Sequence, residues 1–141
     1  MREEGGWTWT DLLNSIDETP PDEDALADRM IGEIEALGLD PAALLPRARI
    51  DEIAAAIQAG DGSGAREVVR RLAPAAVQRL SRRVLLDGGL RSQTERYLRR
   101  YNEIVADAKD RDKEGFMVAA LLSSDPGRAY LLLDAGLGEL S

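Results

Sequence analysis

The sequence predicts an all-α protein: a compact multi-helix bundle of antiparallel helix hairpins with an N-terminal tryptophan-bearing helical arm. Three observations support this fold class. Apolar residues recur at i, i+3, i+4 and i+7 in successive segments, no segment shows the alternation of a half-buried strand, and glycine and proline divide the chain into helix-length pieces. The 141 residues suffice for one α-helical bundle domain over residues 22–141, preceded by the arm and an acidic linker over residues 1–21.

The arm is predicted from residues 5–17. Its apolar stripe has the spacing of one helix face and consists of Trp9, Leu12, Leu13 and Ile16. Thr8 is placed as the N-cap, and Trp7 lies just before it. An acidic stretch containing two prolines follows over residues 18–24 and is typical of a linker. Because about ten residues are too few for a stable isolated helix, we expect this helix only when the arm is docked on a surface.

The next helices are predicted from repeated apolar faces. From about residue 24, one face carries Leu26, Met30, Ile34 and Leu37, and Gly38 ends the helix. A short turn then begins with Asp40 as N-cap and Pro41 at the first helical position, and ends at Pro46. A second face carries Ile50, Ile53, Ala54 and Ile57. The short loop 61–64 leads to a helix with Val68, Val69 and Leu72, so these two helices should form an antiparallel hairpin.

The second half of the chain follows the same pattern. Pro74 restarts a helix whose inner face carries Val77, Leu80 and Val84, and residues 87–89 are predicted to end it. The capping box Ser92–Glu95 is predicted to open a helix with a seam of Leu98, Tyr101, Val105 and Ala108. Residues 107–114 either continue or kink it. Residues 116–122 are apolar all round and predict a buried helix, and a last helix from Asp125 carries residues 130–133 and stops near Gly136.

The composition argues against an enzyme. The chain contains no histidine and no cysteine, which excludes Ser-His-Asp chemistry, thiol nucleophiles, disulfides and metal sites built on those side chains. The glycines of residues 60–64 lack the lysine of a phosphate-binding loop and predict a turn between helices. The carboxylates of residues 107–114 alternate with basic residues and predict a solvated helix face. We therefore expect no enzyme, no cofactor, no metal and no small-molecule substrate.

Membrane segments are also not expected. No apolar run approaches the ~20 residues that span a bilayer, and the first residues lack the apolar stretch of a signal peptide. The sequence thus predicts a cytoplasmic protein.

The net charge of −8 is strongly segregated. Residues 1–65 carry a charge of −11, residues 66–100 carry +7, and residues 101–141 carry −4. Every basic residue in the middle block is an arginine, the side chain that pairs bidentately with carboxylates and phosphates. Three uses of this block remain open: pairing with the acidic helices of the same fold, docking an acidic protein, or binding nucleic acid or anionic lipid.

Two groups of residues are candidates for partner binding. The first is the anchor set in the arm: Trp7, Trp9, Leu12, Leu13 and Ile16. It either packs on the core of its own chain or docks on another. The second is the arginine set of two helices: Arg79, Arg82, Arg83, Arg96, Arg99 and Arg100. In addition, the apolar stretch 116–140 is either core or, where exposed, a dimer surface.

Four phrases together carry a resemblance. They are Gly-Trp-Thr-Trp-Thr-Asp-Leu-Leu (6–13), Arg-Ile-Asp-Glu-Ile-Ala-Ala-Ala-Ile-Gln-Ala-Gly-Asp (49–61), Ala-Arg-Glu-Val-Val-Arg-Arg-Leu-Ala-Pro-Ala-Ala-Val (65–77) and Ser-Asp-Pro-Gly-Arg-Ala-Tyr-Leu-Leu-Leu-Asp-Ala (124–135). The chain resembles, over most of its length, an all-helical module of alphaproteobacterial cell-pole scaffold proteins of the TipN type. Unlike such scaffolds, it contains no long heptad array. The resemblance implies a bacterial, cytoplasmic, non-enzymatic role in cell polarity or cell-cycle organisation through protein contacts.

From these observations we expect a protein-interaction or scaffold module whose partner is another protein or a second copy of the chain in a homodimer. The alternative is a nucleic-acid-associated regulator that uses the arginine-rich middle helices. An acidic isoelectric point near 4.6 argues against that alternative.

Overall fold

The computed structural model describes residues 20–137, with side chains from residue 25 onward. These residues form helices and no strand, which confirms the all-α fold class. The predicted arm and its anchor residues lie outside the described part of the chain. The described helices are α2 (Pro20–Ala36), α3 (Pro41–Leu44), α4 (Arg47–Gln58), α5 (Gly62–Leu72), α6 (Pro74–Leu85), α7 (Gly88–Arg111), α8 (Phe116–Ser123) and α9 (Asp125–Leu137).

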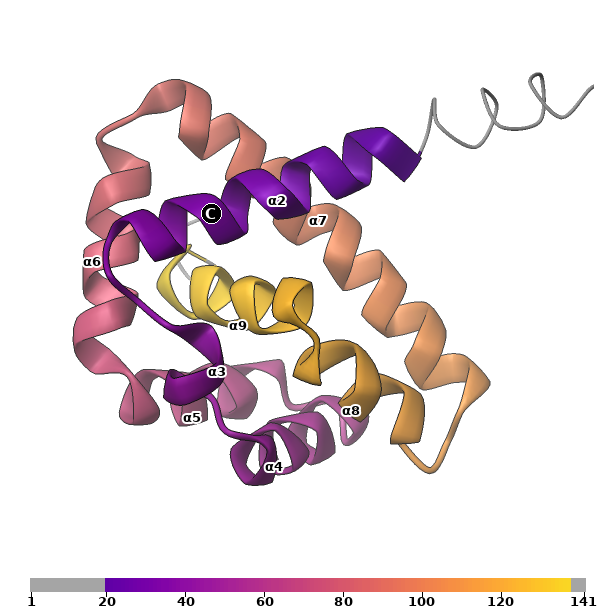
Figure 1. Cartoon of the computed structure of the whole chain (residues 1–141). Helices are drawn as coiled ribbons and strands as arrows, with labels where there is room; N and C mark the ends of the chain where they lie inside the picture. Colours follow the sequence, from indigo (N-terminus) through magenta and orange to yellow (C-terminus); the bar gives the residue numbers. More distant parts are fainter. Residues whose placement is uncertain (1–19, 138–141) are drawn as a thin grey trace, which may run out of the picture.

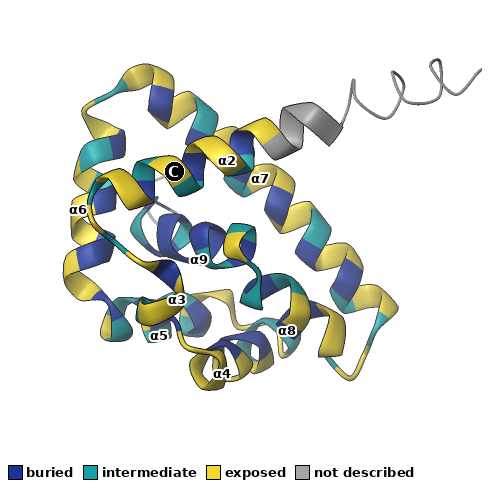
Figure 2. Ribbon diagram, viewed as in Figure 1, coloured by how far each residue is buried: buried dark blue, intermediate teal, exposed yellow. Residues whose placement is uncertain are grey.

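The last helix, α9, lies at the centre of the molecule (Figure 1). It packs against α2, α3, α5, α6, α7 and α8, which together surround it. Eight of its thirteen residues are buried, and it is the helix with the most continuous buried surface in Figure 2. The buried residues are Gly127, Ala129, Tyr130, Leu131, Leu132, Leu133, Ala135 and Leu137. The bundle is therefore organised around an apolar axial helix.

Two glycines allow other helices to come close to α9. A Cβ atom at Gly127 would overlap the carbonyl oxygen of Leu121 in α8, and one at Gly136 would overlap the hydroxyl of Ser81 in α6. The backbone of α9 thus approaches α8 and α6 more closely than any residue with a side chain would permit.

Most predicted helix faces and several boundaries are confirmed. The face of α2 is buried at Met30 and Ile34, and Gly38 takes the left-handed conformation (φ 78°) just after the helix ends. The Asp40 carboxylate accepts a hydrogen bond from the amide of Ala42, which makes it the N-cap of α3. Helices α4 and α5 pack along each other as the predicted hairpin. The buried residues of α6 include the predicted Val77, Leu80 and Val84.

Two predicted boundaries are wrong for the same reason. Residues 61–64 were expected to be a loop, but α5 already begins at Gly62. Residues 87–89 were expected to end the preceding helix; α6 does end just before them, at Leu85, but Gly88 and Gly89 already belong to α7. In each case the preceding aspartate is the N-cap: Asp61 accepts from the amide of Gly64, and Asp87 from the amide of Leu90. The Ser92–Glu95 capping box therefore lies inside α7 and does not open it.

The prediction that residues 116–122 form a fully buried helix is also wrong. Phe116 is 71% exposed and Met117 is 43% exposed, whereas Val118 and Leu122 are fully buried. Helix α8 packs on α4, α7 and α9 with one face and leaves its first turn in solvent. Because the sequence of α8 is apolar on every side, it does not indicate which face is exposed. The helix that lies at the centre of the bundle is α9, so α8 has one side in solvent.

The close contact at Gly127 generates a first prediction. Gly127→Ala should lower the free energy of unfolding by about 1–3 kcal/mol, because the new methyl group meets backbone atoms of Leu121 and Leu122 that cannot rotate away. Urea denaturation followed by circular dichroism measures this change.

The matched control is Gly32→Ala in α2, where a Cβ would meet no atom within 4 Å. This variant should gain about 0.4–1 kcal/mol, since alanine reduces the conformational freedom of the unfolded chain. Equal unfolding midpoints for the two variants would contradict the close packing of α8 on α9.

Candidate functional site

Two arginines of the predicted binding set belong to the structural framework. The Arg79 guanidinium donates to the carbonyl of Leu37 at the end of α2, with a distance of 2.7 Å. Arg83 pairs with Glu33 of α2 at 3.2 Å and with Asp87, the N-cap of α7, at 3.4 Å. The pKa of Asp87 is lowered, first by the hydrogen bond from the Leu90 amide and then by Arg83. These two arginines thus join α2, α6 and α7.

Most other arginines of the middle block also have partners inside the chain. Arg66 pairs with Asp134 of α9 at 2.9 Å, and Arg70 donates to the carbonyl of Ala135. Further pairs join Arg71 to Glu67, Arg91 to Glu95 and Arg100 to Glu103. Seven of the ten arginines of this block therefore contact groups of their own fold, and two of them, Arg66 and Arg83, reach carboxylates of the acidic segments outside the block.

Three arginines remain exposed and make no ion pair with any residue in the described range 20–137: Arg82, Arg96 and Arg99. Arg96, Arg99 and Arg100 follow one another at i, i+3 and i+4 along α7, so their side chains leave the helix on its outer side. We call these three residues the α7 arginine group. The structure does not bring Arg79 and Arg83 into it, because they are bound at the junction of α2 and α6.

An apolar groove lies beside α7, and one member of the α7 arginine group, Arg100, belongs to its lining. It has a volume of about 280 Å³ and runs between the first described turns of α2, the middle of α7 and the junction of α8 with α9. Arg100 stands at its edge. Its main apolar contributors are Leu26, Ala27, Tyr97, Tyr101, Ile104, Leu121 and Pro126. We call this the α2–α7 groove. Sequence reasoning missed it, since its walls come from segments almost 100 residues apart.

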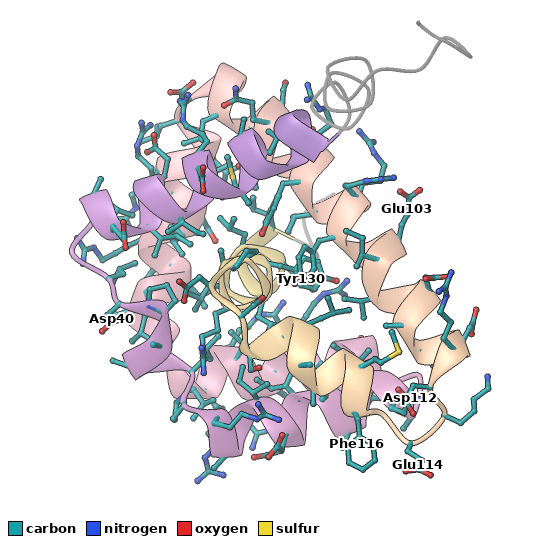
Figure 3. The ribbon with its side chains drawn as sticks, turned by 45° about the vertical axis from the view of Figure 1, so that its right-hand side comes forward. Asp40, Glu103, Asp112, Glu114, Phe116 and Tyr130 are labelled. Atoms are coloured by element: carbon teal, nitrogen blue, oxygen red, sulfur yellow. The ribbon has the colours of Figure 1, made fainter. Side chains whose placement is uncertain are left out.

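The groove floor is held in place by tyrosines. The Tyr97 hydroxyl donates to the carbonyl of Pro126 at 2.6 Å, and the Tyr101 hydroxyl donates to the carbonyl of Leu121 at 2.8 Å. The Tyr101 ring stacks on Tyr130 of α9, with centroids 5.0 Å apart, and Tyr130 lies in the interior in Figure 3. Burial raises the pKa of all three tyrosines. The floor is therefore neutral and fixed to the backbone at the α8–α9 junction. In the sequence, the i, i+4 spacing of Tyr97 and Tyr101 already indicated that the two rings lie on the same face of one helix.

The acidic stretch of residues 107–114 is explained by local contacts. Asp107 pairs with Arg111 at 3.0 Å. The Asp112 carboxylate accepts from the amides of Met117 and Glu114, and these hydrogen bonds lower its pKa. Asp112 thus orders the turn between α7 and α8, which Figure 3 shows beside Phe116. In the part of the chain that the structure describes, no three acidic, cysteine or histidine side chains gather in a way that could hold a metal ion.

Exposed apolar side chains occur at two separate places. Phe116 and Met117 begin α8, and Phe116 points away from the ribbon in Figure 3. Leu85 and Leu86 lie at the end of α6, and Leu86 is 80% exposed. Among the described residues of the stretch 116–140, the exposed large apolar side chains are those of Phe116 and Met117, so the expected dimer surface would lie at the first turn of α8.

Comparisons with known protein families, curated proteins and solved structures give no match to this chain. Among the described residues, no helix is both long and apolar enough to cross a bilayer. The class of protein is therefore argued from the surface features above.

The tyrosines generate a prediction for alkaline pH. Because their folded-state pKa values are raised, the unfolded chain loses protons first as the pH rises above about 10, so stability present below pH 10 is lost above it. Tyr97→Phe should flatten the dependence of unfolding free energy on pH between 10 and 12 by up to about 1.4 kcal/mol per pH unit. Urea titrations across this range measure the slope, and identical slopes for both proteins would contradict the assignment.

The different roles of neighbouring arginines generate a further prediction. Arg83→Ala should lower stability by about 0.5–1 kcal/mol, since it removes partly exposed ion pairs to Glu33 and Asp87. Arg82→Ala, one residue away and exposed, should change it by less than about 0.5 kcal/mol. Thermal unfolding of the two variants measures these changes in stability. A larger loss of stability for Arg82→Ala than for Arg83→Ala would refute the structural role of Arg83.

Proposed function

We propose that the protein is a non-enzymatic protein-interaction module that binds an acidic, amphipathic segment of a partner protein. The observation that carries this proposal is the presence of one exposed arginine, Arg100, in the lining of the otherwise apolar α2–α7 groove, with Arg96 one turn earlier on the same helix. The apolar floor takes large side chains of the segment, and the guanidinium groups pair with its carboxylates.

The dimensions of the groove favour a peptide side chain as its occupant. A volume of about 280 Å³ lies just below the range of about 300–1,000 Å³ usual for small-molecule sites. Its lining is mostly aromatic and aliphatic, with a single charged residue at the edge. Aromatic and arginine side chains are also the types enriched at the energetically important centres of protein interfaces.

The resemblance to cell-pole scaffold proteins agrees with this module. It extends the proposal to a bacterial, cytoplasmic scaffold that acts in cell polarity or cell-cycle organisation. Such a role requires binding to other proteins but no catalysis, and the same groove would provide that binding.

Nucleic-acid binding is the second candidate function. It is favoured by one observation, the exposure of Arg82, Arg96 and Arg99 without carboxylate partners in the described chain. Against it stands the net charge of −8, which repels a polyanion at longer range than these arginines attract it.

A charge-reversal experiment separates the two functions. The probe is a fluorescein-labelled acidic peptide with leucine and tryptophan at helical spacing, and its binding is followed by fluorescence anisotropy. Arg96→Glu combined with Arg100→Glu should weaken binding of this peptide about tenfold or more, which corresponds to about 1.4 kcal/mol. Labelled duplex DNA should not bind.

The matched control is Arg47→Glu combined with Arg49→Glu on α4, because these arginines are also exposed but lie away from the groove. The control should bind the peptide as the unmodified protein does. Tight, salt-sensitive binding of DNA that the α7 substitutions abolish would replace the proposed function by nucleic-acid binding.

A further inference from the structure

The α2–α7 groove lies directly beside the place where the chain enters the described structure. Leu26 and Ala27, which form one wall, stand in the second turn of α2, only a few residues after Pro20. Nineteen residues precede α2 in the sequence, and they contain both tryptophans of the protein. The groove and this segment are therefore close along the chain.

We propose that the α2–α7 groove is occupied by residues 7–16 of the same chain, so that the protein carries its own competing ligand. This inference rests on the proposed function, because it uses the same groove as the peptide-binding site. The inference identifies the first occupant of the groove. It also states how partner binding is regulated, because an external partner has to displace the segment.

The segment has the chemistry that the groove requires. Its predicted helical stripe presents Trp9, Leu12 and Leu13 on one face, which suits the aromatic and aliphatic floor. The nineteen residues carry five carboxylates and one arginine, whereas the charged residue in the groove lining is a cation, Arg100. Apolar surface and charge are thus complementary at the same time.

The chain is also long enough to reach its own groove. Pro20 disfavours helical backbone at Thr19, so a helix ahead of it ends there and the chain is free to reverse direction. The four residues from Ile16 to Pro20 span up to about 14 Å when extended. The groove wall at Ala27 lies about 10 Å along α2 from Pro20, so Ile16 reaches it without stretching.

Tethering explains why the chain's own segment occupies the groove before a partner does. A short flexible linker holds a segment at an effective concentration on the order of millimolar. A cellular partner at much lower concentration must therefore have a higher intrinsic affinity for the groove than the tethered segment in order to displace it. The consequence is an autoinhibited module that responds only to a segment of higher affinity.

Intrinsic fluorescence tests this directly, because Trp7 and Trp9 are the only tryptophans in the protein. The full-length chain should emit at shorter wavelength than a synthetic peptide of residues 1–19, and acrylamide should quench it less. Ala27→Glu places a carboxylate in the groove wall and should move both values to those of the peptide. Ala56→Glu, the matched control at another partly buried alanine, should leave them unchanged.

A second pair of variants keeps the test decisive if Ala27→Glu fails to fold. Arg100→Glu reverses the charge at the groove edge, and Arg71→Glu is its control, since both arginines are exposed and pair with a glutamate on their own helix. Arg100→Glu alone should shift the emission to longer wavelength. An unmodified chain whose emission and quenching equal those of the peptide would overturn the inference, as would equal shifts in the groove and control variants.

Sedimentation equilibrium separates the chain's own groove from that of a second copy. A monomer mass at all concentrations is expected. A dimer that Ala27→Glu dissociates would overturn docking within one chain and assign an exchanged arm.

A final comparison separates this inference from the proposed function. Trp7→Ala combined with Trp9→Ala should increase the affinity of the full-length chain for the labelled acidic peptide, because the competitor is weakened. If the peptide binds both proteins equally and the groove variants leave the emission unchanged, the inference fails and the function stands. If the groove variants shift the emission but no acidic peptide binds either protein, the function fails while the docked segment remains.

Discussion

The enclosure of α9 is the constraint on which the rest of the structure depends. This helix is apolar on nearly all sides, so it must be covered from every direction, and six other helices do so. Fully burying a single leucine such as Leu132 contributes about 1.5–3 kcal/mol, and α9 contributes several such residues. Helices α8 and α6 approach the backbone of α9 closely at Gly127 and Gly136, where α9 has no side chain. Arginines add hydrogen bonds around this helix: Arg70 of α5 donates to the carbonyl of Ala135 in α9, and Arg128 of α9 donates to the carbonyls of Leu45, just after α3, and Ser123, at the end of α8.

The α2–α7 groove is a consequence of how α9 begins. The chain turns sharply between α8 and α9, which leaves the carbonyls of Leu121 and Pro126 turned toward α7. Buried carbonyls require donors, and the hydroxyls of Tyr97 and Tyr101 supply them. The same two rings then form the floor of the groove. A feature that satisfies the core therefore also creates an aromatic surface at the edge of the bundle, beside exposed arginines.

The parts of this fold that the sequence predicted are those determined by neighbours in the chain. Most helix faces, the stop at Gly38 and the cap at Asp40 depend on residues within one or two turns, and these are confirmed in the part of the chain that the structure describes. The start of α7 was missed because two capping signals, Asp87 and the box Ser92–Glu95, lie within eight residues. Asp87 is the N-cap, since a helix that begins there buries Leu90 and Thr94 in the core. Hydrophobicity also cannot distinguish α8 from α9, since only packing decides which apolar helix lies at the centre. The groove and the pairing of Arg83 with Glu33 depend on contacts across some 50 to 100 residues.

The segregated charge of the chain has one use within the fold and, in the proposed function, a second at the surface. Most arginines of residues 66–100 contact helix ends and carboxylates of their own fold, where a planar guanidinium with several donors satisfies groups from two elements at once. The exposed α7 arginines cannot supply much affinity by themselves, because charges at the surface are screened beyond about 8 Å at physiological salt. Apolar contact in the groove must provide the affinity, whereas the arginines set the orientation and the rate of encounter. If the groove binds competing segments as we propose, their apolar residues decide the competition, and charge determines which segments arrive.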